Sequence, residues 1–180
     1  MHGDVALYER LSLEAFQSGL AWITILRKRP AFRAAFAGFD PQAVARFDDD
    51  DVARLLADAG IVRNRAKIAA TIANARAVLD LWDGGQSLDE IVWSHAPDAA
   101  SIPDTSHASG RVRATTFSEV PASTPESAAL AAALKRRGFR FVGPTTAYAT
   151  MQACGLVDDH LAGCPVAVAL EQGPRPTLDR

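Results

Sequence analysis

The sequence has only two cysteines, Cys154 and Cys164, which is too few for a disulfide framework. It has no apolar run approaching the ~20 residues that a membrane span needs. Its first residues contain neither the basic segment nor the continuous apolar segment of a signal peptide. These absences argue against a secreted, disulfide-stapled domain and against a membrane protein. We therefore expect a cytoplasmic protein in a reducing compartment.

The sequence also lacks an excess of positive charge, since its formal net charge is −2. A near-neutral protein can still bind a phosphate backbone through one basic face, because the contact is local and screened within about 8–10 Å. The basic residues gather in three clusters, which are Arg27-Lys28-Arg29, Arg63 with Arg65 and Lys67, and Lys135-Arg136-Arg137 with Arg140. The alternative is that each cluster is a solvated helix surface.

Alternating strand patterns and internal repeats are also missing, and the segments between breaks have helical spacing instead. We expect one helix from Val5 to about Leu26, limited by Pro30, and a long alanine-rich helix from Ile61 to Leu81. Helix-start patterns occur at Asp40-Pro41, Asp48 to Asp51, Ser87 with Glu90, Thr124-Pro125 and Gly143-Pro144. The prediction is an all-α fold with an irregular loop over 96–123 and a disordered tail over 165–180.

One segment combines two glycines with flanking cations. In it a helix ends near Arg137-Gly138, a short hairpin follows, and a new helix begins at Gly143-Pro144-Thr145. Glycine lets a backbone approach a phosphate closely, and a helix start offers unpaired N–H groups and a positive dipole end. The arrangement suits non-sequence-specific binding of a DNA backbone. A tight connection between two helices is the alternative interpretation.

Glu14 lies at the edge of an apolar helical surface, close in direction to Leu7. A carboxylate there could face a pocket that binds a cation, or it could act as a general base. Trp22, eight residues further on, could supply a flat stacking wall. The alternatives are a glutamate at the core boundary and a tryptophan buried in the core.

His160 and Cys164 are four residues apart, which places them on one helical face or in one tight loop. Both are good zinc ligands, but a structural zinc site needs four. Cys154, His95 and His107 are further candidates, although none has a ligand-like spacing to this pair.

These motifs belong to a longer series of stretches that match one family over residues 4 to 164, interrupted mainly between 95 and 123. The series comprises Leu13-Glu14-Ala15-Phe16-Gln17-Ser18-Gly19-Leu20-Ala21-Trp22-Ile23-Thr24, Leu26-Arg27-Lys28-Arg29 with Phe32, Phe39-Asp40-Pro41 with Val44-Ala45, Gly60 to Ile68, Asn74-Ala75-Arg76, and Leu130 to Cys164. Together they resemble DNA-3-methyladenine glycosylase I, a family of the helix-hairpin-helix glycosylase superfamily.

The resemblance implies a two-lobed helical domain over 1–164 with a base pocket between the lobes. Glu14 matches the family's pocket glutamate, and Trp22 matches the tryptophan of the pocket wall. Gly19 and Leu20 match the segment that inserts into the gap left by a flipped nucleotide. The DNA-gripping residues would be Arg137, Gly138, Gly143 and Thr145 of the hairpin.

The implied activity is base-excision repair of alkylated double-stranded DNA by a monomeric enzyme. The enzyme would hydrolyse the N-glycosidic bond of 3-methyladenine and leave an abasic site without cutting the strand. Methylation at N3 makes the base a cation, so the leaving group is already activated. Glu14 is therefore expected to recognise the base electrostatically, with a direct acid/base role as the further option.

In the family, His160 and Cys164 match two of four ligands of a structural zinc ion. The other two ligands, and aromatic residues that complete the pocket, belong to a segment upstream of the present Met1, so the resemblance implies an N-terminal truncation. We expect this chain to bind zinc weakly or not at all. Ala15 in place of a glycine beside Glu14, and His95 in place of an aromatic residue, are further departures.

Two other functions remain open. One is a non-catalytic remnant of the same fold that grips DNA through the hairpin and Arg137. The other is a general helical interaction module, which would show no salt-dependent affinity for DNA.

Overall fold

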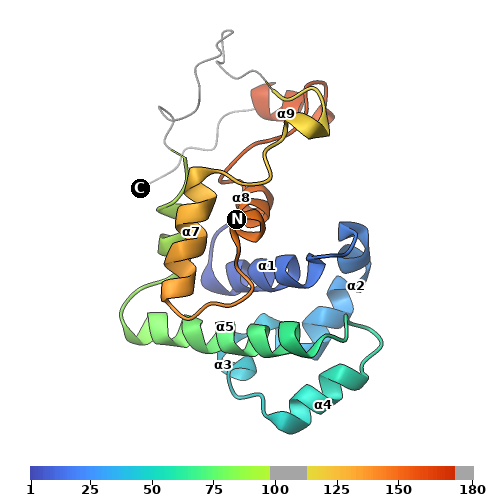
Figure 1. Cartoon of the computed structure of the whole chain (residues 1–180), viewed down its shortest axis with the longest axis vertical. Coiled ribbons are helices and arrows are strands. Elements are labelled where there is room, and N and C mark those ends of the chain that lie inside the picture. Colours follow the sequence, from blue (N-terminus) through green and yellow to red (C-terminus); the bar gives the residue numbers. More distant parts are fainter. Residues whose placement is uncertain (98–112, 173–180) are drawn as a thin grey trace.

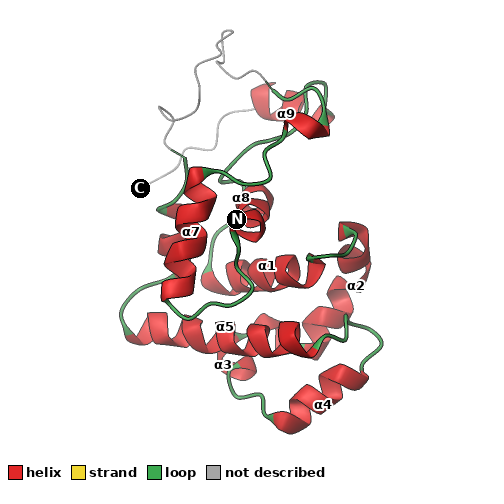
Figure 2. Ribbon diagram, viewed as in Figure 1, coloured by secondary structure: helices red, strands yellow, loops and turns green. Residues whose placement is uncertain are grey.

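The computed structural model describes residues 1–97 and 113–172, and all regular secondary structure in these ranges is helical, as predicted (Figure 2). Its elements are α1 (Asp4–Gln17), α2 (Trp22–Ala35), the 3-10 turn η1 (Ala37–Phe39), α3 (Pro41–Val44), α4 (Asp49–Ala57), α5 (Arg65–Asp83), α6 (Leu88–Trp93), the 3-10 turn η2 (Phe117–Glu119), α7 (Pro125–Arg136), α8 (Pro144–Cys154) and α9 (Pro165–Gln172).

Helix α1 joins the two ends of the molecule. It packs on α5, α2, α6 and α8, while α7 packs mainly on α8 (Figure 1). The long helix α5 runs beneath α1 in this view, and α9 lies at the far end of the α7–α8 pair. The helices on both sides of α1 share one core, which contains Phe16, Ile68 and Leu134.

Local capping explains where most helices begin. Asp48 accepts hydrogen bonds from the backbone of Asp50 and Asp51, and Ser87 forms a reciprocal capping box with Glu90. Thr124 caps α7 in the same way through Ser127. Each cap satisfies N–H groups that have no partner inside the helix, so these predicted starts are confirmed.

The prediction of a single helix from Val5 to Leu26 is wrong. Helix α1 ends at Gln17, residues 18–21 are not helical, and α2 begins at Trp22. Gly19 has φ +83°, a left-handed conformation that favours glycine and that no right-handed helix contains. Pro30 does not limit α2, which continues to Ala35. Buried Phe32 and Ala35 anchor the turn after Pro30 and offset the lost N–H hydrogen bond.

An ion cluster fixes α2 against α1. Arg29 Nε and Arg33 Nε lie 2.7 and 2.9 Å from Glu9 Oε1. Burial opposes ionisation of Glu9, but the hydrogen bonds from the two arginines lower its pKa overall. Arg29 therefore forms its ion pair within the protein. Lys28 also bonds within the protein, because its Nζ donates to the carbonyls of Ala59 and Gly60. Two members of this basic cluster therefore stabilise the fold.

The prediction of a disordered tail over 165–180 is wrong for 165–172, which form α9. Pro165 stands at the first helical position, where its missing N–H costs nothing, and Ala167 is buried. Residues 173–180 lie outside the described residues, as does 98–112 of the predicted irregular loop. The described part of that loop, 113–123, contains only the short turn η2. No helix in the described ranges is long and apolar enough to cross a membrane.

Candidate functional site

Glu14, Arg10 and Trp22 lie together at the junction of α1 and α2. Glu14 is buried on α1, with 6% of its surface exposed. Arg10 Nη1 lies 3.7 Å from Glu14 Oε1, one helical turn away. The Arg10 guanidinium carbon also lies 5.3 Å from the centre of the Trp22 ring, which is the distance of a cation–π contact. The structure therefore brings the two predicted pocket residues to one cation that sequence reasoning did not select.

Burial raises the pKa of Glu14, although the positive charge of Arg10 partly offsets the shift. The Cys154 thiol of α8 is part of the same environment, and burial raises its pKa to about 11. The thiol is therefore neutral at physiological pH. Glu14 thus sits in an apolar setting where a carboxylate interacts strongly with any nearby cation.

Lys67 of α5 holds the segment that separates Glu14 from Trp22. Its side chain is buried, and Nζ donates to the carbonyl of Phe16 at 3.0 Å and to that of Ser18 at 2.6 Å. These carbonyls belong to the end of α1 and would otherwise lack partners. The next residues, Gly19 and Leu20, are exposed. Lys67 thereby fixes the base of an exposed turn, hereafter the α1–α2 turn (residues 18–21).

The predicted hairpin lies between α7 and α8 and is hereafter the α7–α8 hairpin (residues 137–143). Helix α7 ends in a Schellman motif, in which Phe139 N–H donates to Leu134 O and Gly138 N–H to Lys135 O. Gly138 has φ +86°, so a glycine is required there. Arg137 is half-buried, and Arg140 is exposed. The segment thus connects the end of α7 to the start of α8.

Asn74 of α5 fastens this hairpin from behind. Its buried side chain accepts from Arg140 N–H at 2.7 Å and donates to Arg140 O at 3.1 Å. Both backbone groups at the hairpin's midpoint are therefore paired with one side chain. Sequence reasoning missed this role, because a buried asparagine inside an apolar helix is the only signal and its partner lies 66 residues away.

At the other end of the hairpin, Gly143 precedes the first turn of α8. The N-cap residue, Gly143, has no side chain to cap this helix, and Thr145 is exposed. The N–H groups in the first turn of α8, together with the helix dipole, can bind an anion. The predicted residues Arg137, Gly138, Gly143 and Thr145 thus lie within one short connection and its first helical turn.

His160 and Cys164 lie in a turn before α9, not on a helix. His160 Nδ1 and Cys164 Sγ are 3.8 Å apart. Zn–N and Zn–S bonds of about 2.0 and 2.3 Å at a tetrahedral angle would separate the two atoms by roughly 3.5 Å. The pair therefore fits two ligands of one zinc ion. Among the described residues, no group of three or more histidine, cysteine, aspartate or glutamate residues could hold a metal; His107 lies outside them.

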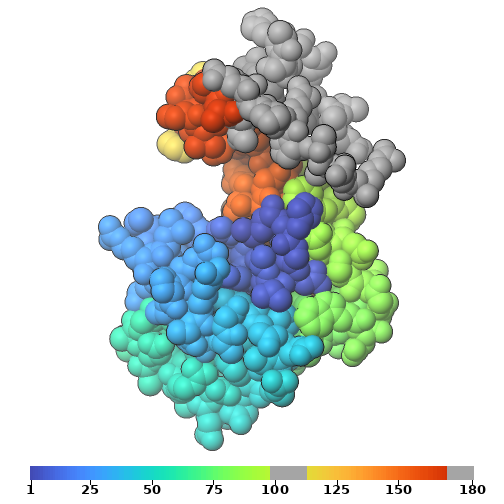
Figure 3. Space-filling model, turned by 180° about the vertical axis from the view of Figure 1, so that it is seen from behind, coloured from blue at the N-terminus to red at the C-terminus, as the bar shows by residue number. Residues whose placement is uncertain are grey.

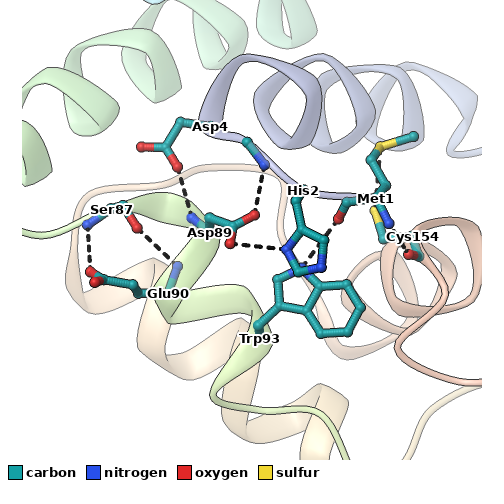
Figure 4. Close-up of polar contacts among 9 residues, drawn as sticks. Met1, His2, Asp4, Ser87, Asp89, Glu90, Trp93 and Cys154 are labelled. Carbon is teal, nitrogen blue, oxygen red and sulfur yellow. Dashed lines mark hydrogen bonds and ion pairs between the residues drawn. The ribbon is translucent and has the colours of Figure 1, made fainter. Parts of the chain in front are cut away.

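The first residues of the chain fasten α1 to α6 and α8 (Figure 4). His2 stacks on Trp93 with ring centres 4.2 Å apart, and its Nδ1 lies 3.1 Å from Asp89. Asp4 accepts from the backbone N–H of Asp89, and Met1 N donates to the carbonyl of Cys154. These contacts place the start of α1, and with it Arg10 and Glu14, against α8.

Seen from behind, the surface is hollowed between the α1–α2 end and the α8–α9 end of the molecule (Figure 3). A separate hollow of about 420 Å³ is lined by Phe47, Asp48, Arg76 and Arg140 among others. Neither Glu14 nor Trp22 lines it, so this hollow is not the predicted pocket.

Comparison with known proteins identifies close relatives. The methyladenine glycosylase family matches residues 1–167. DNA-3-methyladenine glycosylase 1 of Escherichia coli strain K12 is 49% identical over 158 residues, covering 88% of this chain and 80% of the relative. A crystal structure of a 3-methyladenine DNA glycosylase I is 45% identical with a TM-score of 0.80, covering 91% of this chain and 85% of the other. A structure of the Staphylococcus aureus enzyme, which concerns 3-methyladenine recognition, is 30% identical with a TM-score of 0.79, covering 92% and 83%.

Proposed function

Because the chain belongs to the methyladenine glycosylase family, we propose that it excises 3-methyladenine from alkylated DNA by hydrolysing the N-glycosidic bond. The relatives that it matches are named as DNA-3-methyladenine glycosylases, and the chain covers most of their length. The observation that carries the proposal is that the buried Glu14 and the Trp22 ring both contact the guanidinium of Arg10. A buried carboxylate and an aromatic face that meet at one cation are a site for a planar organic cation.

N3-methylation makes the attached adenine a planar cation. Glu14 attracts that charge, and its effect is strong because burial removes competing water. Trp22 offers a stacking surface worth about 0.5–2 kcal/mol for a cation. As the bond to the sugar breaks, the base leaves without needing a strong acid. Glu14 therefore acts mainly by recognising the base and by favouring its flipped position.

The flipped position leaves a gap in the duplex that an apolar side chain can fill. Leu20 is 39% exposed at the tip of the α1–α2 turn, with Gly19 beside it. Lys67 holds the turn from below, so the exposed side chain is carried on a fixed backbone. We assign Gly19 and Leu20 to the segment that enters the duplex.

The α7–α8 hairpin is assigned to the DNA backbone. Gly138 and Gly143 allow a close approach, the start of α8 offers N–H groups near Thr145, and Arg137 adds positive charge. Contacts of this kind fix the protein's position on the duplex without reading sequence. The substrate is accordingly double-stranded DNA, and we expect a cytoplasmic enzyme that acts as a monomer.

An excision assay on this chain tests the proposal. Methylated duplex DNA is incubated with the protein, and released bases are separated by chromatography. Release of free 3-methyladenine is expected. DNA binding without release supports instead the non-catalytic remnant, which the hairpin geometry alone would also allow.

We propose further that His160 and Cys164 are zinc ligands. Their 3.8 Å separation supports this, and a bound zinc would tie the turn before α9 into one rigid unit. With two ligands from the described residues, we expect this chain to bind zinc weakly. Metal analysis after purification should find much less than one zinc per chain; stoichiometric zinc would show that further ligands complete the site.

A further inference from the structure

The site proposed for the base already contains a cation of the protein's own. The Arg10 guanidinium lies 3.7 Å from Glu14 and 5.3 Å from the centre of the Trp22 ring. Its side chain is only 14% exposed, so this is not a loose surface pair. We infer that Arg10 competes with the cationic base for Glu14 and Trp22, and so sets how strongly the protein prefers a cationic base to a neutral one. This inference rests on the proposed function.

The competition follows from the similar chemistry of the two cations. A guanidinium and an N3-methylated adenine are both planar, delocalised and positively charged. Each gains from a carboxylate at its edge and an aromatic ring at its face. One ring face cannot be covered by both at once. A base that stacks on the same face of Trp22 must therefore displace Arg10.

Charge adds to the steric competition. Where Arg10 stays near Glu14, it neutralises the carboxylate that would attract the base and repels an incoming cation directly. The chain's N-terminal ammonium and Asp89 also act on Cys154, as Arg10 and Glu14 do. A neutral base is not repelled by Arg10. The expected signature of Arg10 is therefore a difference between cationic and neutral ligands, which mere packing would not produce.

Arg10 can give way because of where it is attached. It lies one turn before Glu14 on α1, at i and i+4, and keeps one edge at the surface. Its four-bond side chain can swing towards solvent without moving the helix. The Arg10 side chain can therefore leave the site and return to it, and it is not a fixed part of the pocket wall.

Two small ligands separate the charge effect from the stacking effect. The 3,9-dimethyladeninium ion is a permanent cation that mimics the base while it is still attached to the sugar. Free 3-methyladenine at pH 8 serves as the neutral ligand, which has the same ring system and lacks the 9-methyl group. Affinities of both are measured by calorimetry for the wild-type protein, Arg10→Met, Glu14→Gln and Arg46→Met. Arg46 is exposed and distant in sequence from the site, so its variant controls for loss of one positive charge.

Arg10→Met is expected to bind the cation about tenfold more tightly and the neutral base no more than about threefold more tightly. Arg46→Met should match the wild type, and Glu14→Gln should bind the cation more weakly. Equal or weaker cation binding by Arg10→Met, while Glu14→Gln still loses affinity, would overturn the role of Arg10 and leave the proposed function standing. No binding of either ligand by any variant would overturn the proposed function and this inference with it.

Circular dichroism confirms that each variant is folded before the calorimetry. If Arg10→Met does not fold, Arg10→Gln replaces it, since glutamine keeps a polar side chain and removes the charge. The same tenfold gain for the cation is expected, and its absence counts against the inference equally.

Discussion

The α1–α2 turn and the α7–α8 hairpin are both fastened by one helix, but by different chemistry. Lys67 and Asn74 are seven residues apart on α5, two helical turns, and so project from one face. Lys67 holds two carbonyls at the α1–α2 turn through a charged ammonium, and Asn74 holds an N–H and a carbonyl of Arg140 through a neutral amide. Helix α5 thereby sets the distance between the two regions.

The difference between the two regions matches what each is proposed to contact. The α1–α2 turn adjoins the buried Glu14, which is paired with Arg10. Interactions near the turn are therefore mainly between charged groups. The hairpin offers glycines and backbone N–H groups, and its fastening does not titrate. Selecting a base and holding a backbone therefore fall to separate parts that can be perturbed one at a time.

The largest expected effect separates the two regions by function. Glu14→Gln keeps the shape of the side chain and removes its charge, so excision should fall by about 100-fold or more. Affinity for unmodified duplex DNA should stay within about twofold, because the hairpin is untouched. Single-turnover release of 3-methyladenine and fluorescence anisotropy measure the two quantities. Normal excision by the variant would remove Glu14 from the site.

Asn74→Ala should show the opposite pattern. It leaves both backbone groups of Arg140 without their partner, which should cost about 1–3 kcal/mol of unfolding free energy. The loosened hairpin should weaken DNA binding by about tenfold. Asn64→Ala, which removes only the N-cap of α5, is the matched control. It should lose about 1 kcal/mol and keep its DNA affinity; an equal loss of affinity would make the Asn74 effect a general one of stability.

Lys67→Met tests the other fastening and should cost about 1–2 kcal/mol in urea unfolding. The freed α1–α2 turn should exchange its amide hydrogens faster at Ser18 and Leu20, whose N–H groups donate to the carbonyls of Glu14 and Gln17, while the hairpin amides keep their rates. Arg65→Met, at an exposed position of the same helix, should change neither. Faster exchange in both regions would show that α5 as a whole, and not Lys67, had been loosened.

The smallest effect concerns pH. Burial raises the pKa of Glu14 in the folded protein above that in the unfolded chain. The stability that this carboxyl contributes is therefore complete below the unfolded pKa and is lost as pH rises through the folded one. Glu14→Gln should exceed the wild type by up to about 1 kcal/mol at pH 7, with the gain vanishing near pH 4. Thermal unfolding across this range measures it, and a variant less stable at pH 7 would indicate a structural role for Glu14.

How far the sequence predicted these features depended on the range of the interactions. The helix starts after Asp48, Ser87 and Thr124 and the helix end at Gly138 depend on neighbours within a few residues, and all were predicted. The continuation of α2 through Pro30 was not, because it depends on tertiary burial of Phe32.

The site shows the same division. Glu14, Trp22 and the hairpin glycines could be selected from local pattern and family resemblance. Arg10, Lys67 and Asn74 could not be given their roles, because each acts through a contact that only the folded chain creates. A lysine or an asparagine within a helix is ordinary until its buried partner is known.

The division of labour is tested most directly by single-turnover excision at saturating protein, with Glu14→Gln and Asn74→Ala compared with the wild type in one assay. Saturation removes differences in DNA affinity, so Asn74→Ala should release 3-methyladenine at close to the wild-type rate. Glu14→Gln should remain at least about 100-fold slower. Slow release by Asn74→Ala at saturation, or normal release by Glu14→Gln, would contradict the assignment of base and backbone to separate regions.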